Sequence, residues 1–172
     1  MSPCGPLTRS CSGFDFSFEL VQIAAALFMV QVQHNAKLNQ LLIDIGRSLL
    51  QYVGHCSSWS SRSDAALAAE FPSLVATQQE HVGQLSELLT ERRWSIDFGG
   101  FPATYTDLHF LSLKYLVKII LTNQKAVLAE LEEASHTCVD DPEAAALIAE
   151  ILTSERQITD RLQSLAKPAV AV

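Results

Sequence analysis

The most regular stretch of this chain is DDPEAAALIAEILTSERQITDRLQSL, residues 140–165. It opens with two aspartates and a proline, which suit a helix start because aspartate caps free N–H groups and proline lacks one. Glu143 adds an acid at the positive end of the helix dipole. The stretch therefore predicts an amphipathic helix that ends before Pro168. Its apolar stripe consists of Leu147, Ile148, Ile151, Leu152, Ile158, Leu162 and Leu165.

Three further stretches have the same helical period. The first covers about residues 36–57, the second runs from about residue 64 or 73 to 93, and the third runs from Thr106 or Asp107 to about 135. Pro72 lies near the start of the second, where a missing N–H costs little. No strand-like alternation occurs, so the sequence predicts an all-α fold, an antiparallel four-helix bundle. The stripes are formed by Leu38, Leu41, Leu42, Ile45, Leu49, Tyr52, Val53 and Cys56, by Leu74, Leu85 and Leu88, and by Leu108, Leu111, Tyr115, Ile119, Val127 and Leu131.

One connection, residues 94–106, is much longer than the others. At about 3.3 Å per extended residue it can span a bundle, which would make the second and third helices parallel. The connection also contains Trp94, Phe98, Phe101 and Tyr105. Two interpretations stay open for these aromatic side chains: they seal one edge of the bundle, or they form a docking surface.

The chain changes in composition before residue 36. Residues 1–15 are rich in Pro, Gly and Ser and predict a disordered lead-in. Residues 16–35 carry apolar residues at helical spacing and predict an N-terminal helix. Four alternatives stay open for that helix. It packs on the bundle, it caps a partner, it runs on into the next helix, or it is an extension upstream of the true start of the protein. The predicted organisation is a lead-in (1–15), an N-terminal helix (16–35) and a bundle domain (36–167).

Composition narrows the classes of partner. Hydrophobic residues make up 48% of the 172 residues and charged residues 18%, which favours extensive helix burial or self-association, as a homo-oligomer or with a protein partner. The 19 acidic and 12 basic residues give a net charge of −7, which argues against nucleic acid as a partner.

Two further patterns bear on location. The four cysteines, Cys4, Cys11, Cys56 and Cys138, form no metal or disulfide pattern, so they favour a reducing cytoplasm. The apolar run from Leu20 to Val32 is too short for a membrane span and is not followed by a signal cleavage pattern. The sequence therefore supports neither export nor insertion and disfavours a membrane partner.

Polar residues inside the apolar stripes are the candidate site. Gln78 and His81 lie between Leu74 and Leu85 on the spacing i, i+4, i+7, i+11, and Glu155 lies between its neighbouring isoleucines on the same rule. A buried carboxylate is costly unless it is paired, hydrogen-bonded or bound to a metal. We therefore expect a partner for Glu155, with His81 as the first choice.

The order of these motifs resembles a known family. Ser48-Leu-Leu-Gln-Tyr52, the run Gln78-Gln-Glu-His81-Val-Gly-Gln-Leu85, Gly99-Gly-Phe-Pro102, Thr106-Asp107-Leu108 and Ile151-Leu152-Thr-Ser-Glu155 resemble the four helices of bacterioferritins and rubrerythrins. The likeness covers about residues 36–166. It implies a ferritin-like bundle, a fold that in this family holds two metals between its helices.

The resemblance also implies where the metal ligands would be. The family's Glu, Glu-x-x-His, Glu and Glu-x-x-His fall on Ile45, on Gln78 and His81, near Leu111, and on Glu155 and Ile158. Two ligands of six survive, which is too few for iron or manganese. A slip of one position would bring in Asp44 or Glu80 instead, and Glu80 would then leave the stripe.

Two functional hypotheses follow. The first is a non-enzymatic ferritin-like bundle without a cofactor that acts through self-association or protein binding, with the N-terminal helix as the added contact. The second is a metalloprotein with an altered site at His81 and Glu155, beside Gln78, that handles iron, manganese or zinc. Membrane-surface attachment through residues 16–32 is a weaker third hypothesis.

Overall fold

The computed structural model describes residues 16–56, 60–61, 64–108 and 110–166. These ranges are helical with connecting segments and contain no β-strand, so the all-α prediction is confirmed for them. The predicted lead-in, residues 1–15, and Pro168 lie outside the described residues. The chain divides between Val32 and Gln33 into two compact units.

The helices follow one another in a simple order. They are α1 (Phe16–Gly46), α2 (Leu49–His55), α3 (Ala65–Glu91), the 3₁₀ helix η2 (Ala103–Leu108), α4 (Leu113–Thr137) and α5 (Pro142–Ala166).

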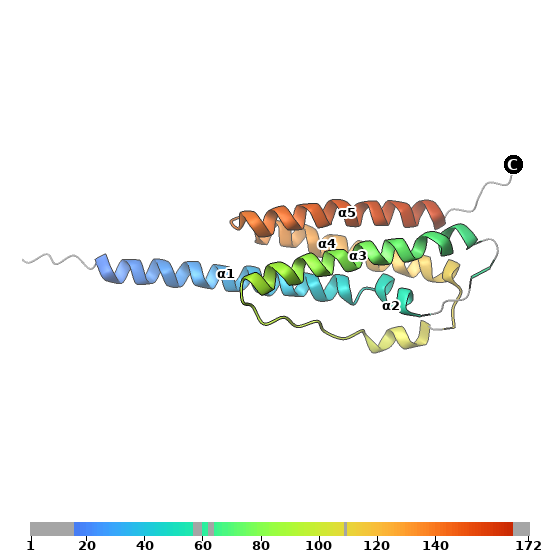
Figure 1. Ribbon diagram of the computed structural model, residues 1–172, viewed down its shortest axis with the longest axis horizontal. Coiled ribbons are helices and arrows are strands. Elements are labelled where there is room, and N and C mark those ends of the chain that lie inside the picture. The colour runs from blue at the N-terminus through green and yellow to red at the C-terminus, as the bar shows by residue number, and fades with distance from the viewer. Residues whose placement is uncertain (1–15, 57–59, 62–63, 109, 167–172) are drawn as a thin grey trace, which may run out of the picture. The chain divides into compact units, whose positions relative to one another are not determined.

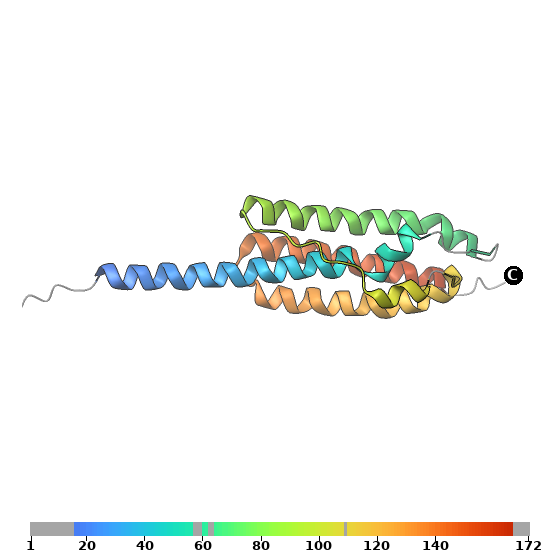
Figure 2. The same cartoon turned by 90° about the horizontal axis from the view of Figure 1, so that it is seen from below.

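In the second unit, four long helical stretches lie side by side: residues 33–46 of α1, α3, α4 and α5 (Figures 1 and 2). This part of α1 and α5 run in one direction, and α3 and α4 run in the other. The connection from α3 to α4 returns along the length of the helices before η2 (Figure 2). It therefore makes α3 and α4 parallel, as its length predicts.

Two predicted helix boundaries are wrong. The predicted helix 36–57 is broken between Gly46 and Leu49, where Ser48 adopts an extended backbone and its side chain accepts the Gln51 N–H to cap α2. The predicted start at Thr106 or Asp107 belongs to η2, because the Ser112 side chain caps α4 by accepting the Tyr115 N–H.

The remaining boundaries agree with one of the alternatives for each helix. Residue 35 ends no helix, because α1 continues through it, so the N-terminal helix runs on into the next one. The second helix takes the earlier of its two predicted starts, and Pro72 lies inside α3 rather than at its first turn. Asp141 caps α5 through its side chain, which accepts the Ala144 N–H at 3.2 Å, as the opening motif predicts.

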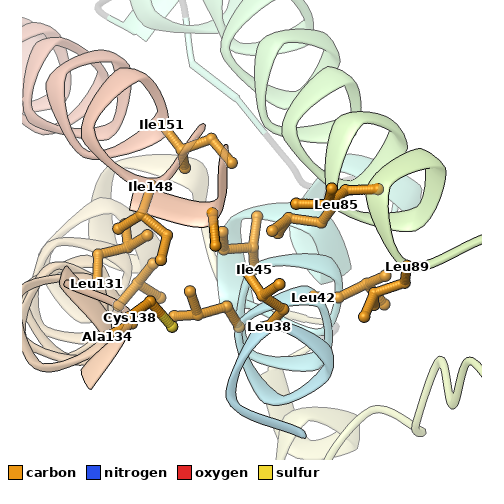
Figure 3. Packing of buried hydrophobic residues seen from close by; sticks show 14 residues of the cluster. Leu38, Leu42, Ile45, Leu85, Leu89, Leu131, Ala134, Cys138, Ile148 and Ile151 are labelled. Carbon is orange, nitrogen blue, oxygen red and sulfur yellow. The ribbon is translucent and has the colours of Figure 1, made fainter. Parts of the chain in front are cut away.

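The apolar core of this unit forms two clusters. One lies where α1 meets the C-terminal halves of α3 and α4 and the first half of α5, and Figure 3 shows its side chains interdigitating. The other lies around α2, the first halves of α3 and α4 and the end of α5. Fully buried members of the first include Leu38, Ile45, Leu85, Leu131, Ile148 and Ile151, and of the second Leu50, Ile120 and Leu162.

The aromatic side chains of the long connection lie mainly against the helices. The ring of Tyr52 on α2 lies 5.3 Å from those of Phe101 and Tyr105, and Trp94 packs on the first core cluster. Phe98 is 49% exposed. Three of the four aromatics therefore cover an edge of the bundle, and one faces solvent.

Candidate functional site

A layer of buried polar side chains separates the two apolar clusters. It draws on α2 and its capping residue and on α3, α4 and α5. Its members are Ser48 and Gln51 from the α1–α2 junction, Gln78 and His81 from α3, Gln124 from α4, and Glu155 and Thr159 from α5, all at most 4% exposed. We call this set the polar layer.

Glu155 is the centre of the polar layer. Its Oε1 lies 2.7 Å from His81 Nδ1, so the expected partner is the one observed. Its Oε2 accepts hydrogen bonds from the amide nitrogens of Gln78, at 3.1 Å, and of Gln124. The backbone carbonyl of Glu155 accepts the Thr159 hydroxyl at 2.8 Å. Each carboxyl oxygen of this fully buried residue thus has a nitrogen partner, which offsets the cost of its burial.

The polar layer continues to the break in the first helix. Ser48 Oγ donates to Gln78 Oε1 at 2.7 Å, and Gln51 Nε2 donates to the same oxygen at 3.3 Å and to the Val75 carbonyl at 2.9 Å. Asn123 Oδ1 accepts the free Leu49 N–H at 2.8 Å. The break therefore places the capping serine in the interior, where it joins side chains of α2, α3, α4 and α5 in a hydrogen-bonded network.

The polar layer has little capacity to act on a substrate. In the part of the chain that the structure describes, the buried side-chain atom without a partner is Gln84 Oε1, which lies outside the layer. His81, the partner of Glu155, is only 4% exposed. A fully satisfied interior network fixes the packing of the helices relative to one another.

The donor set also fits a metal poorly. Iron and manganese prefer several carboxylate oxygens, whereas the polar layer offers one carboxyl group whose oxygens already accept N–H donors. Across residues 16–56, 60–61, 64–108 and 110–166, no three His, Cys, Asp or Glu side chains are grouped so that they could hold a metal ion.

Two positions expected from the family pattern do not lie in the polar layer. Ile45 belongs to the first apolar cluster, and Leu111 precedes α4, so neither faces Glu155. The alternatives from a slipped register fail as well, because Asp44 bonds to Gln40 instead, at 2.9 Å, and Glu80 is exposed. In the polar layer, the α1–α2 region contributes Ser48 and Gln51 instead of Ile45, and α4 contributes Gln124 instead of a residue near Leu111.

Sequence reasoning missed Gln124 although the signal was present. Ile120, Gln124, Val127 and Leu131 follow the spacing i, i+4, i+7, i+11 that singles out Glu155. Ser48 carries no such signal, since its role depends on the break in the helix.

A second polar network joins the end of α3 and the start of α5 to α1. Arg92 at the end of α3 binds Asp141 through both guanidinium nitrogens, at 2.5 and 2.9 Å, and donates to Glu143 at 2.8 Å and to Asn35 at 3.2 Å. His34 Nδ1 lies 3.5 Å from the Asp141 carboxylate. The Arg92 guanidinium holds the pKa of Asp141 below its ordinary value of 3.8, against the opposing effect of burial. This network fastens α1, α3 and α5 together.

No model of a known protein family, no curated protein and no solved structure matches this chain. Searched over its described residues, the structure has no helix long and apolar enough to cross a membrane. Cys56 and Cys138 are free thiols, and burial raises the pKa of Cys138.

Proposed function

We propose that this protein is a non-enzymatic, ferritin-like four-helix bundle that acts through self-association, and that residues 16–32 form the contact. The observation that carries the proposal is the exposure of large apolar side chains there. Phe28 is 65% exposed, Met29 58% and Val30 40%. Adjacent positions on a helix diverge by about 100°, so these side chains cover more than one face. Large apolar side chains that are exposed next to one another commonly mark a surface that a partner covers.

The spacing of this segment favours another helix as that partner. Phe16, Leu20, Ile23, Leu27 and Val30 follow one another at intervals of four, three, four and three residues. That alternation is the seam of a coiled coil, in which two helices bury the same pair of positions in each heptad. A second copy of this chain supplies a matching seam.

Charge favours self-association at the same place. The chain has a net charge of −7, and Glu19 is the one charged residue among residues 16–32. Two copies therefore meet with the least repulsion along this segment. The free thiols of Cys56 and Cys138 agree with action in a reducing compartment, the cytoplasm.

The proposal is tested by changing the exposed apolar residues together, as Phe28→Ser, Met29→Ser and Val30→Ser in one variant. Light scattering on the eluting full chain should give a multiple of 18.9 kDa for the wild type and 18.9 kDa for the variant. The control is Val139→Ser, which changes a 67% exposed residue in the second unit and should leave the mass unchanged.

Two outcomes would overturn self-association. One is a wild type that stays monomeric at every accessible concentration, and the other is a triple variant that keeps the wild-type mass. A monomeric wild type that sediments with liposomes would point instead to attachment at a membrane surface.

The second candidate is a metalloprotein with an altered site, favoured by the 2.7 Å contact between His81 and Glu155. Its test is elemental analysis after incubation with iron, manganese or zinc followed by desalting. Stoichiometric metal that is absent from Glu155→Gln would support this candidate. Metal at background level in the wild type would count against it.

A further inference from the structure

A groove lies between the α1–α2 junction and α3. Its volume is about 380 Å³, which lies within the range of about 300–1,000 Å³ typical of small-molecule sites. Leu42, Val82 and Phe98 give it apolar walls. The groove borders the polar layer at Gln51 but does not include His81 or Glu155, and it lies outside residues 16–32, so neither proposed function uses it.

Two glycines keep this groove open. Gly46 and Gly83 both line it, from α1 and α3. A Cβ atom added at Gly83 would meet nothing within 4 Å, and one at Gly46 would come within 3.4 Å of Val82. Glycine is the least favourable residue in a helix interior after proline, so the space at Gly83 exists at a cost in helix propensity.

The groove carries positive and neutral polar groups. Arg47 and His55 line it together with Gln51, Gln79 and Ser86, and no Asp or Glu is among its lining residues. Within the described ranges, no carboxylate lies within 4.0 Å of Arg47. In those ranges Arg93, Lys114, Lys118 and Lys125 also lack an acid within 4.0 Å, so what distinguishes Arg47 is its place in the groove.

Arg47 is held in place by groups that leave part of its guanidinium free. Its Nε donates to the carbonyls of Phe98 and Gly99, at 2.8 and 3.2 Å, and its guanidinium carbon lies 4.9 Å from the centre of the Phe101 ring. Among the described residues, no acceptor pairs with the two terminal nitrogens. Those nitrogens form the fork that binds a carboxylate through two parallel hydrogen bonds.

A second groove also borders Arg47, but it is acidic. Asp44 and Glu130 line that groove, which repels anions. An anion that binds Arg47 is therefore favoured in the first groove, where His55 adds a second nitrogen donor.

We propose that the groove between the α1–α2 junction and α3 binds a small organic monocarboxylate. The carboxylate pairs with Arg47 and His55, and the apolar body lies against Leu42 and Val82 in the space left by Gly83. Apolar walls favour an organic acid over inorganic phosphate, and the absence of lining acids favours it over an amine.

The test measures binding of octanoate to the full chain by titration calorimetry, with octanamide and inorganic phosphate as comparison probes. We expect octanoate to bind at least about tenfold more tightly than octanamide, since the amide keeps the apolar chain but lacks the negative charge and one acceptor oxygen. Phosphate should bind more weakly than octanoate. Equal affinity for octanoate and octanamide would overturn the proposal, as would no detectable octanoate binding.

Two variants locate the site. Gly83→Leu fills the groove from a position with free space, so thermal unfolding should show an intact fold while octanoate binding is lost. Arg47→Gln should weaken octanoate about tenfold and leave octanamide unchanged. Lys125→Gln, an exposed charge on α4, is the matched control and should bind as the wild type does. Wild-type affinity in Gly83→Leu would place the ligand elsewhere and refute the proposal.

Discussion

The polar layer and residues 16–32 are opposite exceptions to the usual distribution of side chains. In the polar layer, a carboxyl group, an imidazole and three glutamine amides are buried inside the bundle. In residues 16–32, a phenylalanine, a methionine and a valine are exposed. Each arrangement is costly by itself, because buried polar groups lose water and exposed apolar groups order it.

The two regions differ in whether the structure supplies partners. Glu155 has three nitrogen partners, and each of them comes from the helices around it. Phe28 and Met29 keep more than half of their surface exposed. A polar interior with internal partners is explained by folding, whereas an apolar exterior without cover calls for a second molecule. This difference is the basis for our proposal that residues 16–32 serve association, whereas the polar layer stabilises the fold.

The largest expected effect comes from breaking the polar layer. His81→Ala removes a partner of a fully buried carboxyl group and should lower the free energy of unfolding by about 3–5 kcal/mol. Urea unfolding followed by circular dichroism measures it. His136→Ala, on the exposed end of α4, is the control and should cost less than about 1 kcal/mol. Equal losses in both variants would show that the contact between His81 and Glu155 is not a stabilising one.

The next prediction compares the truncation of a buried apolar residue with the truncation of an exposed one. Leu131→Ala leaves a cavity in the first core cluster and should cost about 2–5 kcal/mol, without changing the association of the folded chain. Phe28→Ala should change the unfolding free energy of the isolated monomer by less than about 0.5 kcal/mol and should weaken association. Unfolding at low protein concentration and light scattering at high concentration separate the two. A large loss of monomer stability in Phe28→Ala would show that its side chain packs within one chain.

A smaller effect sharpens the account of buried charge. The pKa of Asp141 is lowered by its hydrogen bonds with Arg92, so the ionised form is favoured in the folded state. The stabilisation is present above the unfolded-state pKa and is lost as the pH falls through the lower folded-state pKa. Asp141→Asn should therefore be less stable than the wild type by about 1–3 kcal/mol at pH 7, and the gap should narrow as the pH falls below the ordinary carboxyl pKa of 3.8. Unfolding curves against pH measure this gap, and a gap that persists at low pH would contradict the assignment.

An effect of similar size concerns the long connection that covers the bundle. Gly99 has a φ of 56°, and a Cβ there would lie 2.8 Å from the Ile43 side chain. Gly99→Ala should lower the melting temperature by an amount equivalent to about 1–3 kcal/mol. Gly100→Ala meets nothing within 4 Å and is the matched control. Similar melting temperatures for the two variants would mean that Gly99 does not pack closely against Ile43 of α1.

Helical periodicity predicted the elements better than their ends. The start of α5 was predictable because Asp141, Pro142 and Glu143 are local signals for the same event. The break at Ser48 was not, since the groups that make it favourable, Asn123 and Gln78, are distant in sequence. The start of α4 was missed because Ser112 can cap a helix as well as Thr106 or Asp107 can, and the structure uses Ser112.

Those residues of the candidate site that lie on the apolar stripes of the helices could be predicted from the sequence. Gln78, His81 and Glu155 lie on stripes, and the structure brings them together. Gln124 lies on a stripe as well and was open to the same reasoning. The exposure of Phe28 could not be predicted, because the sequence pattern of an apolar residue on a helix does not show whether its side chain is buried or exposed.

The most direct test of the central claim is amide hydrogen exchange of the full chain at low and high protein concentration. If a second copy covers residues 16–32, their protection should increase with concentration, while the protection of residues 33–46 should stay constant. Protection of residues 16–32 that is independent of concentration would contradict self-association through this segment.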